Sequence, residues 1–363
     1  MGAWKYVKEN NRKWIAALLL IIVIKVLTFN KLWVERFYST GFYFYFSKIL
    51  RLLFGWIPFS IGDILYFLAG CWIAWKLFSN LISLIKRKIS WKLVFQKLLK
   101  LLLLFAFIYI VFYLFWGINY DRKGIAYQLQ ITPQQYDTSD LLLIQDILLK
   151  KVNDTKAVLV KNHEKYPSTD ELIQRAKRSY ALAEKKFPFL VYKSLSVKSS
   201  LYGTLGDYLG FTGYYNPFTG EAQLNTTFPK MLQPYISTHE IAHQLGYAKE
   251  NEANFVGYLA AVSSSDTLFH YSTYLDLFLY TNREVYYVDS VASHKALNEL
   301  SVPVKKDLIE LKQFDLDHQS VFEPMINWMY GKYLKLNNQP KGLHSYNEVV
   351  GMLIEYYKKY GKI

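Results

Sequence analysis

The sequence predicts three N-terminal membrane helices followed by a mainly helical, α+β domain with a small sheet, and two observations support this prediction. Residues 1–120 contain 16 Lys/Arg against 3 Asp/Glu, whereas the rest of the chain contains 27 against 26. The same first third contains three apolar stretches, each close to the roughly 20 residues that a helix needs to cross a bilayer core. We therefore assign residues 1–120 to a membrane region and residues 121–363 to a water-soluble domain.

The membrane helices are expected at about residues 14–30, 61–85 and 98–118. Lys25 lies near the outer end of the first, where a long side chain can extend to the lipid headgroups. A cleaved signal peptide is an alternative for this first stretch, but no small-residue cleavage site follows it. We therefore expect the stretch to remain as an anchor.

The distribution of basic residues predicts the orientation of these helices. Ten lie in the N-terminal tail and in the loop between the second and third stretches, against four in the loop between the first and second. Because basic loops stay in the cytoplasm, we expect the N-terminus inside and residues 121–363 outside, as in a multi-pass protein of the cell membrane. The larger set is Lys5, Lys8, Arg12, Lys13, Lys86, Arg87, Lys88, Lys92, Lys97 and Lys100, and the smaller set is Lys31, Arg36, Lys48 and Arg51.

The strong positive charge does not indicate a nucleic-acid partner, because the basic residues flank segments that are too apolar to stay in water. The expected partner is the lipid bilayer. Residues 31–60 are aromatic and amphipathic, which favours a position in the plane of the membrane interface, with a short hairpin into the membrane as the alternative. The single cysteine, Cys71, excludes an intrachain disulfide.

Beyond residue 120, helix and turn signals predict the elements of the domain. One helix is expected to start near Ser139 and another after Ser168, where Ser-Thr-Asp-Glu forms a capping box. Further helices are expected at 236–245 and 250–262, with several more from 267 to 359. Strands are expected at 195–202, 210–216 and 221–226, just before the helix at 236–245.

The segment His239-Glu240-Ile241-Ala242-His243 contains the candidate metal ligands and the candidate catalytic base. On a helix, residues four apart lie one above the other, so both imidazoles can bind one tetrahedral Zn²⁺ ion. Glu240 then lies beside the open position of the metal, where a general base for a zinc-bound water is needed. The pattern predicts a zinc hydrolase site with His239 and His243 as metal ligands and Glu240 as the catalytic base.

Such a site needs a third protein ligand. Gly246 can end the helix and turn the chain back, and a third histidine in the extended form of the motif would stand where this chain has Lys249. Two carboxylates follow, those of Glu250 and Glu252. We expect Glu252 to be the ligand, because Ala253 beside it permits close helix packing. Glu250 is the alternative, with a role in orienting a histidine if Glu252 binds the metal.

Two resemblances add to this interpretation. The pairing of His-Glu-x-x-His with a following Glu-x-Glu-Ala-Asn resembles the zincin-type metallopeptidases of the ImmA/IrrE kind, whose glutamate before Ala-Asn binds the metal, and this position is Glu252 here. The string from His239 to Phe255, the three membrane stretches, Tyr333-Leu-Lys and Gly342-Leu-His-Ser-Tyr346 together resemble a bacterial family of unknown function, domain-of-unknown-function family 3810. The resemblance implies a zincin-like fold, and it implies no substrate. Together with the apolar stretches and their charges, a bacterial family predicts a location in the inner membrane.

Two further features of a peptidase have candidates in the sequence. Residues 209–226 are the expected edge strand for an extended substrate, with glycines that let a backbone approach closely, although plain turn chemistry explains the glycines equally well. A second donor to the transition-state oxyanion normally comes from Tyr, His or Arg. The candidates are Tyr346, His344, His318 and Arg283, of which Tyr346 is ranked first on resemblance.

We therefore expect a membrane-anchored zinc metallopeptidase that cleaves a peptide or protein substrate. Two alternatives stay open, namely a non-catalytic zinc-binding or assembly protein of the cell envelope and a zinc hydrolase of a cell-wall amide. An intramembrane protease is disfavoured, because the polar residues Ser237, Gln244 and Lys249 surround the motif.

Overall fold

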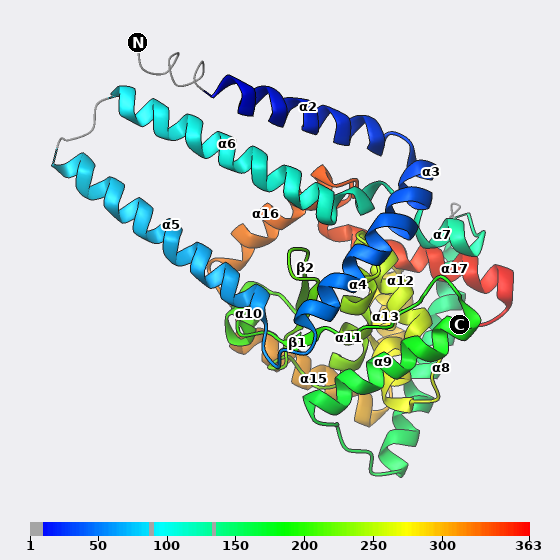
Figure 1. Cartoon of the computed structure of the whole chain (residues 1–363). Coiled ribbons are helices and arrows are strands. Elements are labelled where there is room, and N and C mark those ends of the chain that lie inside the picture. The colour runs from blue at the N-terminus through cyan, green and yellow to red at the C-terminus, as the bar shows by residue number, and fades with distance from the viewer. Residues whose placement is uncertain (1–9, 87–90, 133–135) are drawn as a thin grey trace.

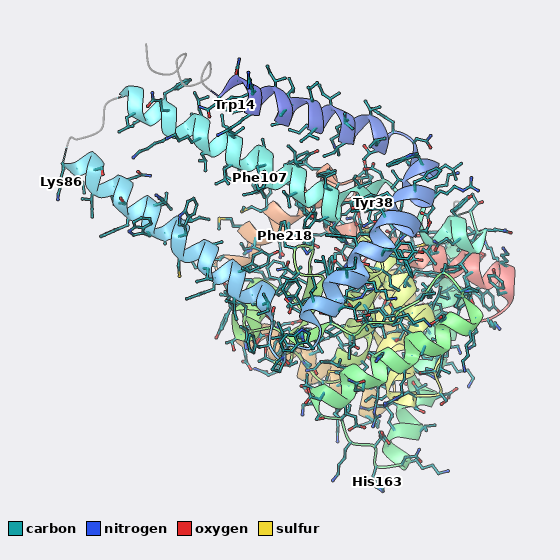
Figure 2. The ribbon with its side chains drawn as sticks, in the orientation of Figure 1. Trp14, Tyr38, Lys86, Phe107, His163 and Phe218 are labelled. Atoms are coloured by element: carbon teal, nitrogen blue, oxygen red, sulfur yellow. The ribbon has the colours of Figure 1, made fainter. Side chains whose placement is uncertain are left out.

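Three long helices at the N-terminal end of the chain extend away from the body that contains the remaining elements (Figure 1). The computed structural model describes residues 10–86, 91–132 and 136–363. The three helices are α2 (Asn11–Thr28), α5 (Ile61–Ile85) and α6 (Trp91–Phe115). Figure 2 shows many of their side chains projecting away from the helices, among them Phe107 on α6, which is 62 % exposed.

Two of these helices are long and apolar enough to cross a membrane, at Ile61–Ser83 and Leu93–Phe115 among the described residues. The first expected span differs from the prediction. It qualifies only when α2 is joined to the following segment Lys31–Phe54, from which it is separated by a bend of 90°. The structure thus has two candidate spans, or three if the bent pair is one span. Of the charges used for orientation, Lys5, Lys8, Arg87 and Lys88 lie outside the described residues.

The segment between the first two long helices packs against the body of the protein. It forms α3 (Lys31–Trp33), the π-helix η1 (Val34–Phe42) and α4 (Tyr43–Phe54). Glu35 of η1 forms a buried ion pair with Arg122 at 2.7 Å, and Arg122 also donates to the carbonyl oxygen of Gly246 at 3.1 Å. Tyr43 of α4 also donates to the carbonyl oxygen of Gln244 at 3.2 Å. A segment expected to lie in the membrane interface therefore contacts the end of the helix that carries the His-Glu-x-x-His motif.

The body is mainly helical, and its core is built around the two helices that carry the candidate site. After η2 (Gly117–Asp121), the helices are α7 (Gly124–Leu129), α8 (Thr138–Lys161), α9 (Thr169–Lys186), α10 (Gly203–Leu209), α11 (Gln233–Gln244), α12 (Glu250–Ala261), α13 (Thr267–Val288), α14 (Ser290–Glu299), α15 (Val302–Asp317), α16 (Glu323–Leu336), η3 (Gly342–Glu348) and α17 (Val349–Tyr360). Two expected starts are confirmed, because α8 begins after a capping box at Asp137 and Ser168 caps α9 by accepting from the backbone N–H of Glu171.

A three-stranded sheet precedes α11 in the described part of the chain. Its strands are β1 (Val197–Ser199), β2 (Gly213–Asn216) and β3 (Glu221–Leu224), in the spatial order β1-β3-β2. β3 pairs parallel to β1 and antiparallel to β2. The three expected strands are therefore present, each shorter than predicted, and the residues between the first two form α10. β2 lies at the edge of the sheet, where one side of its backbone is available for another chain.

The sheet is joined directly to the N-terminal end of α5. The carboxylate of Glu221 on β3 accepts from the backbone N–H groups of Ile61 and Gly62 at 3.1 and 2.6 Å. Asp63 in turn accepts from the hydroxyl group of Tyr214 on β2. Because a helix N-terminus is positively polarised, these buried carboxylates stabilise the start of α5 and fix it to the sheet.

Candidate metal centre

The motif lies on α11, a helix whose residues are all buried. His239, Glu240 and His243 therefore occupy the interior of the body, with His239 and His243 8 % and 6 % exposed. The helix ends at Gln244, and Gly246 follows with a φ of +81°, a conformation that favours glycine. This confirms the expected role of Gly246. The turn also places the carbonyl oxygen of Tyr247 2.8 Å from Nδ1 of His243.

α12 crosses α11 closely enough for its first residue to reach both histidines. Gly257 lies at this crossing, where a Cβ atom would come within 3.1 Å of the backbone nitrogen of His239. One carboxylate oxygen of Glu250, Oε2, lies 3.3 Å from Nε2 of His239 and 3.4 Å from Nε2 of His243. The three side chains form a buried group of potential metal ligands.

The distances of Glu250 from the two imidazoles are compatible with a tetrahedral metal ion such as zinc. Tetrahedral zinc with bonds of about 2.0–2.2 Å has its ligand atoms about 3.3–3.6 Å apart, which matches the separations of Glu250 from both imidazoles. Oε2 of Glu250 is buried and makes no hydrogen bond in the described structure. The contact between Nδ1 of His243 and the Tyr247 carbonyl leaves Nε2 to face the group, an orientation typical of metal-binding histidines.

The structure replaces Glu252 by Glu250 in the candidate ligand set. Residues two apart on a helix point about 200° apart, so the two carboxylates cannot both face α11. Glu252 points to the other side, with Oε1 3.6 Å from Nζ of Lys249. It also packs on Gly124, where any Cβ atom would lie 2.1 Å from the carboxylate. Ala253 is buried, but it does not bring its neighbour Glu252 to the histidines.

The charges within the group stabilise one another. Burial alone would raise the pKa of Glu250, but the two imidazoles outweigh it and hold the pKa of this carboxyl well below its ordinary value. Burial would likewise lower the pKa of His243, but the charge of Glu250 outweighs it and raises the pKa of His243 to about 9. The group therefore keeps a carboxylate ready for a cation, while a proton on His243 competes for the same position.

Glu240 lies at the same centre but in a different environment. Burial raises its pKa to about 7, although the neighbouring histidines oppose this shift. Its Oε2 atom is buried without a hydrogen-bond partner among the described residues. Oε1 lies against Gly213 of β2, where a Cβ atom would be only 2.5 Å away. Gly213 therefore gives Glu240 its place between the helix and the edge strand.

A cavity of about 430 Å³ opens beside these residues. Its walls come from one end each of α5 and α6, from η2, from the edge strand β2 and the loops beside the sheet, and from α11, α12, α13, α16 and η3. The edge of β2 from Gly213 to Tyr215 lies along it, as expected for residues 209–226. The position of this strand is therefore as expected, and the binding of an extended substrate along it stays a prediction.

Of the four expected oxyanion donors, Tyr346 alone lines the described cavity. Its ring stacks on that of His239 with centroids 6.5 Å apart, and burial raises its pKa well above the ordinary value, so the hydroxyl group keeps its proton. His344 and Arg283 are exposed. His318 packs on Phe314 instead, with ring centroids 4.2 Å apart.

Three functional candidates carried no recognisable signal in the sequence. Tyr330 of α16 donates a hydrogen bond to Oε1 of Glu250 at 2.7 Å and thereby orients the other oxygen toward the histidines. Asp276 of α13 lines the cavity, and burial raises its pKa to about 7. Trp116 follows α6 and donates from its indole nitrogen to the carbonyl oxygen of His243 at 3.3 Å. Each comes from a segment far from the motif, so spacing could not identify it.

The fold and the site define a mainly helical protein with two or three candidate membrane helices and a buried His-His-Glu group that could hold a metal. The chain belongs to a family of proteins of unknown function, DUF3810, and the model of this family matches residues 38–354. This confirms the family resemblance seen in the sequence. Neither the curated proteins nor the solved structures contain a match to the chain.

Proposed function

We propose that the protein is a zinc-dependent metallopeptidase, held in the bacterial inner membrane with its N-terminus in the cytoplasm and residues 121–363 outside. The observation that carries this proposal is the convergence of His239, His243 and Glu250 on one buried point beside Glu240. A purely structural zinc site is closed by protein ligands, whereas a hydrolytic one has three and an open position. The three ligands beside a cavity match the second pattern.

His239, His243 and Glu250 would hold the zinc ion. When bound, zinc supplies a Lewis acid and lowers the pKa of a water molecule toward neutrality. Glu240 is the residue that accepts a proton from the attacking water and delivers it to the leaving amine. A general base works best when its pKa is near the working pH, and burial brings the pKa of Glu240 to about 7.

Two tyrosines complete the proposed machinery. Tyr346 retains its hydroxyl proton because burial raises its pKa, so it can donate a hydrogen bond to the oxygen that becomes negatively charged. Tyr330 lies 3.4 Å away, hydroxyl to hydroxyl, and its bond to Glu250 fixes the ligand rather than the substrate.

The position of the edge strand β2 supports the proposal that the substrate is a polypeptide. Its unpaired side from Gly213 to Tyr215 lies along the cavity next to Glu240. An extended chain can add to such an edge through backbone hydrogen bonds, and side-chain pockets then provide selectivity. A short sheet whose edge lies beside the motif helix, followed by a helix with the third ligand, also supports the proposed zincin-like fold.

The proposal is tested by comparing the full-length protein with Glu240→Gln on a peptide library read by mass spectrometry. The variant keeps the size of the side chain and all three ligands. We expect the wild type to cleave peptides, and the variant to lose about 10²–10⁴-fold in rate, the usual contribution of a general base, with its zinc content unchanged.

Equal cleavage by both proteins would contradict the role of Glu240. A zinc-loaded wild type that cleaves no peptide but releases amines from cell-wall fragments would favour the amide hydrolase instead. Inactivity toward both substrates would favour the envelope assembly protein.

A further inference from the structure

Helix α16 has two faces of opposite character. One face is turned to the body, and it includes Asn327, Tyr330 and Tyr333, which line the cavity. The other face is largely apolar and solvent-exposed in the described structure. Its apolar residues are Phe322, just before the helix, and Met325, Trp328, Met329 and Leu336, which are 52–80 % exposed. Large apolar side chains gathered on one helix face indicate a surface that contacts another apolar phase.

The position of α16 in the fold indicates which phase this is. Its inner face packs on the outer end of the candidate span α6. The hydroxyl groups of Tyr120 and Tyr333 lie 2.9 Å apart, and Tyr113 of α6 donates to Asn337 at 3.1 Å. α16 is therefore fixed at the C-terminal end of the candidate span α6, and in Figure 1 it lies in the region between α5 and α6, near the body.

The exposed face also carries the side chains that are typical of a membrane interface. Lys332 lies over the ring of Trp328 at 5.7 Å, and Lys335 is exposed near the end of the helix. An aromatic and basic rim around an apolar stripe is the composition of helices that lie in the headgroup layer, because the lysines reach the phosphates while the apolar side chains enter the acyl boundary.

A second helix extends this surface beside the other span. Leu201, two residues before α10, and Leu205 on α10 are 57 % and 54 % exposed. The segment is attached to the outer end of α5, since the backbone N–H of Leu201 and the hydroxyl group of Tyr202 both donate to Asp63 at 2.8 Å. Exposed apolar residues thus flank the outer ends of both candidate spans.

We propose that the exposed face of α16 lies in the headgroup layer of the same bilayer that α5 and α6 cross. The occupant of this face is the lipid surface, since the face is continuous with the ends of two membrane helices. The opposite face of α16 lines the cavity, so the candidate site lies within about one helix diameter, roughly 10 Å, of the membrane surface. This placement does not depend on the proposed peptidase activity.

The test uses spin labels on the full-length protein in nanodiscs of phosphatidylethanolamine and phosphatidylglycerol. Cys71→Ser removes the single natural cysteine, and single cysteines are then introduced at Met325, Trp328 or Met329. Matched controls are cysteines at Val160 and Ile309, which are 49 % and 66 % exposed on α8 and α15. Electron paramagnetic resonance then measures collisions of each label with oxygen, which partitions into lipid, and with a water-soluble nickel chelate.

We expect the oxygen-to-nickel collision ratio to be severalfold higher at the three α16 positions than at the two controls. Ratios equal to those of the controls would overturn the proposal. Labels on α16 that are shielded from both reagents would also overturn it, because a protein partner or a second copy would then cover the face. All labelled positions are exposed, so the variants are expected to keep the melting temperature of the Cys71→Ser protein.

Discussion

The choice between two neighbouring carboxylates gives the sharpest prediction. Glu250→Gln keeps the shape of the side chain and its contact with Tyr330, but it removes the charge that lies 3.3 and 3.4 Å from the two imidazoles. Glu252→Gln makes the same chemical change two residues away, on the opposite side of α12. The pair therefore separates the ligand from its neighbour with identical substitutions.

The expected size of the effect follows from the number of ligands. Zinc in a four-ligand protein site has an apparent binding free energy of roughly 10–16 kcal/mol, or about 2.5–4 kcal/mol per ligand. Each 1.4 kcal/mol is a factor of about ten, so Glu250→Gln should weaken zinc binding by roughly two to three powers of ten. Glu252→Gln should change it by less than about tenfold, the lower end of the range for outer-shell partners.

The assay is a zinc titration of the full-length protein in detergent, in competition with a fluorescent chelator. Helix content and melting temperature of the metal-free variants control for folding. Equal losses in the two variants, or a larger loss for Glu252→Gln, would refute the assignment of Glu250 and would restore Glu252 as the ligand.

Three other consequences of the geometry are measurable. Glu250 raises the pKa of His243 to about 9, so the metal-free site holds a proton that zinc must displace. Zinc affinity should therefore rise by up to about tenfold per pH unit between pH 7 and 9, and a flat profile from the same titration would contradict this. Gly213→Ala places a methyl group 2.5 Å from Glu240 and 2.9 Å from the carbonyl oxygen of Gln223 on β3. The variant should lower kcat while zinc content stays unchanged, whereas an unchanged kcat would show that close packing of Gly213 on Glu240 and β3 is not needed. Tyr330→Phe removes the hydrogen bond to Glu250 and should weaken zinc binding about 10–100-fold, and unchanged affinity would remove Tyr330 from the ligand support.

Local signals in the sequence predicted much of the fold. The apolar run at 61–85 coincides with α5. It could be predicted because a mainly apolar stretch of this length is typical of a membrane-spanning helix. The polar starts of α8 and α9 were visible because capping residues act on their own backbone neighbours. The spacing of His239 and His243 likewise predicted a shared face of α11, and the structure places both at one buried group.

Long-range packing was beyond the sequence patterns. Helical periodicity shows that Glu250 and Glu252 lie on opposite faces of α12, but not which face packs on α11. The close approach of Gly257 to the backbone of His239 determines that face. The burial of Glu35 depends on Arg122, 87 positions away along the chain. The amphipathic sequence of residues 31–60 therefore could not show that this segment packs on the body.

The amount of metal in the protein tests the central claim most directly. The full-length chain, purified in detergent without added chelator, should contain about one zinc ion per chain by mass spectrometry. The amount should fall sharply in His239→Ala and stay the same in Glu240→Gln. A folded wild-type protein that neither retains zinc nor takes it up on titration would contradict the proposal that this site is a zinc hydrolase.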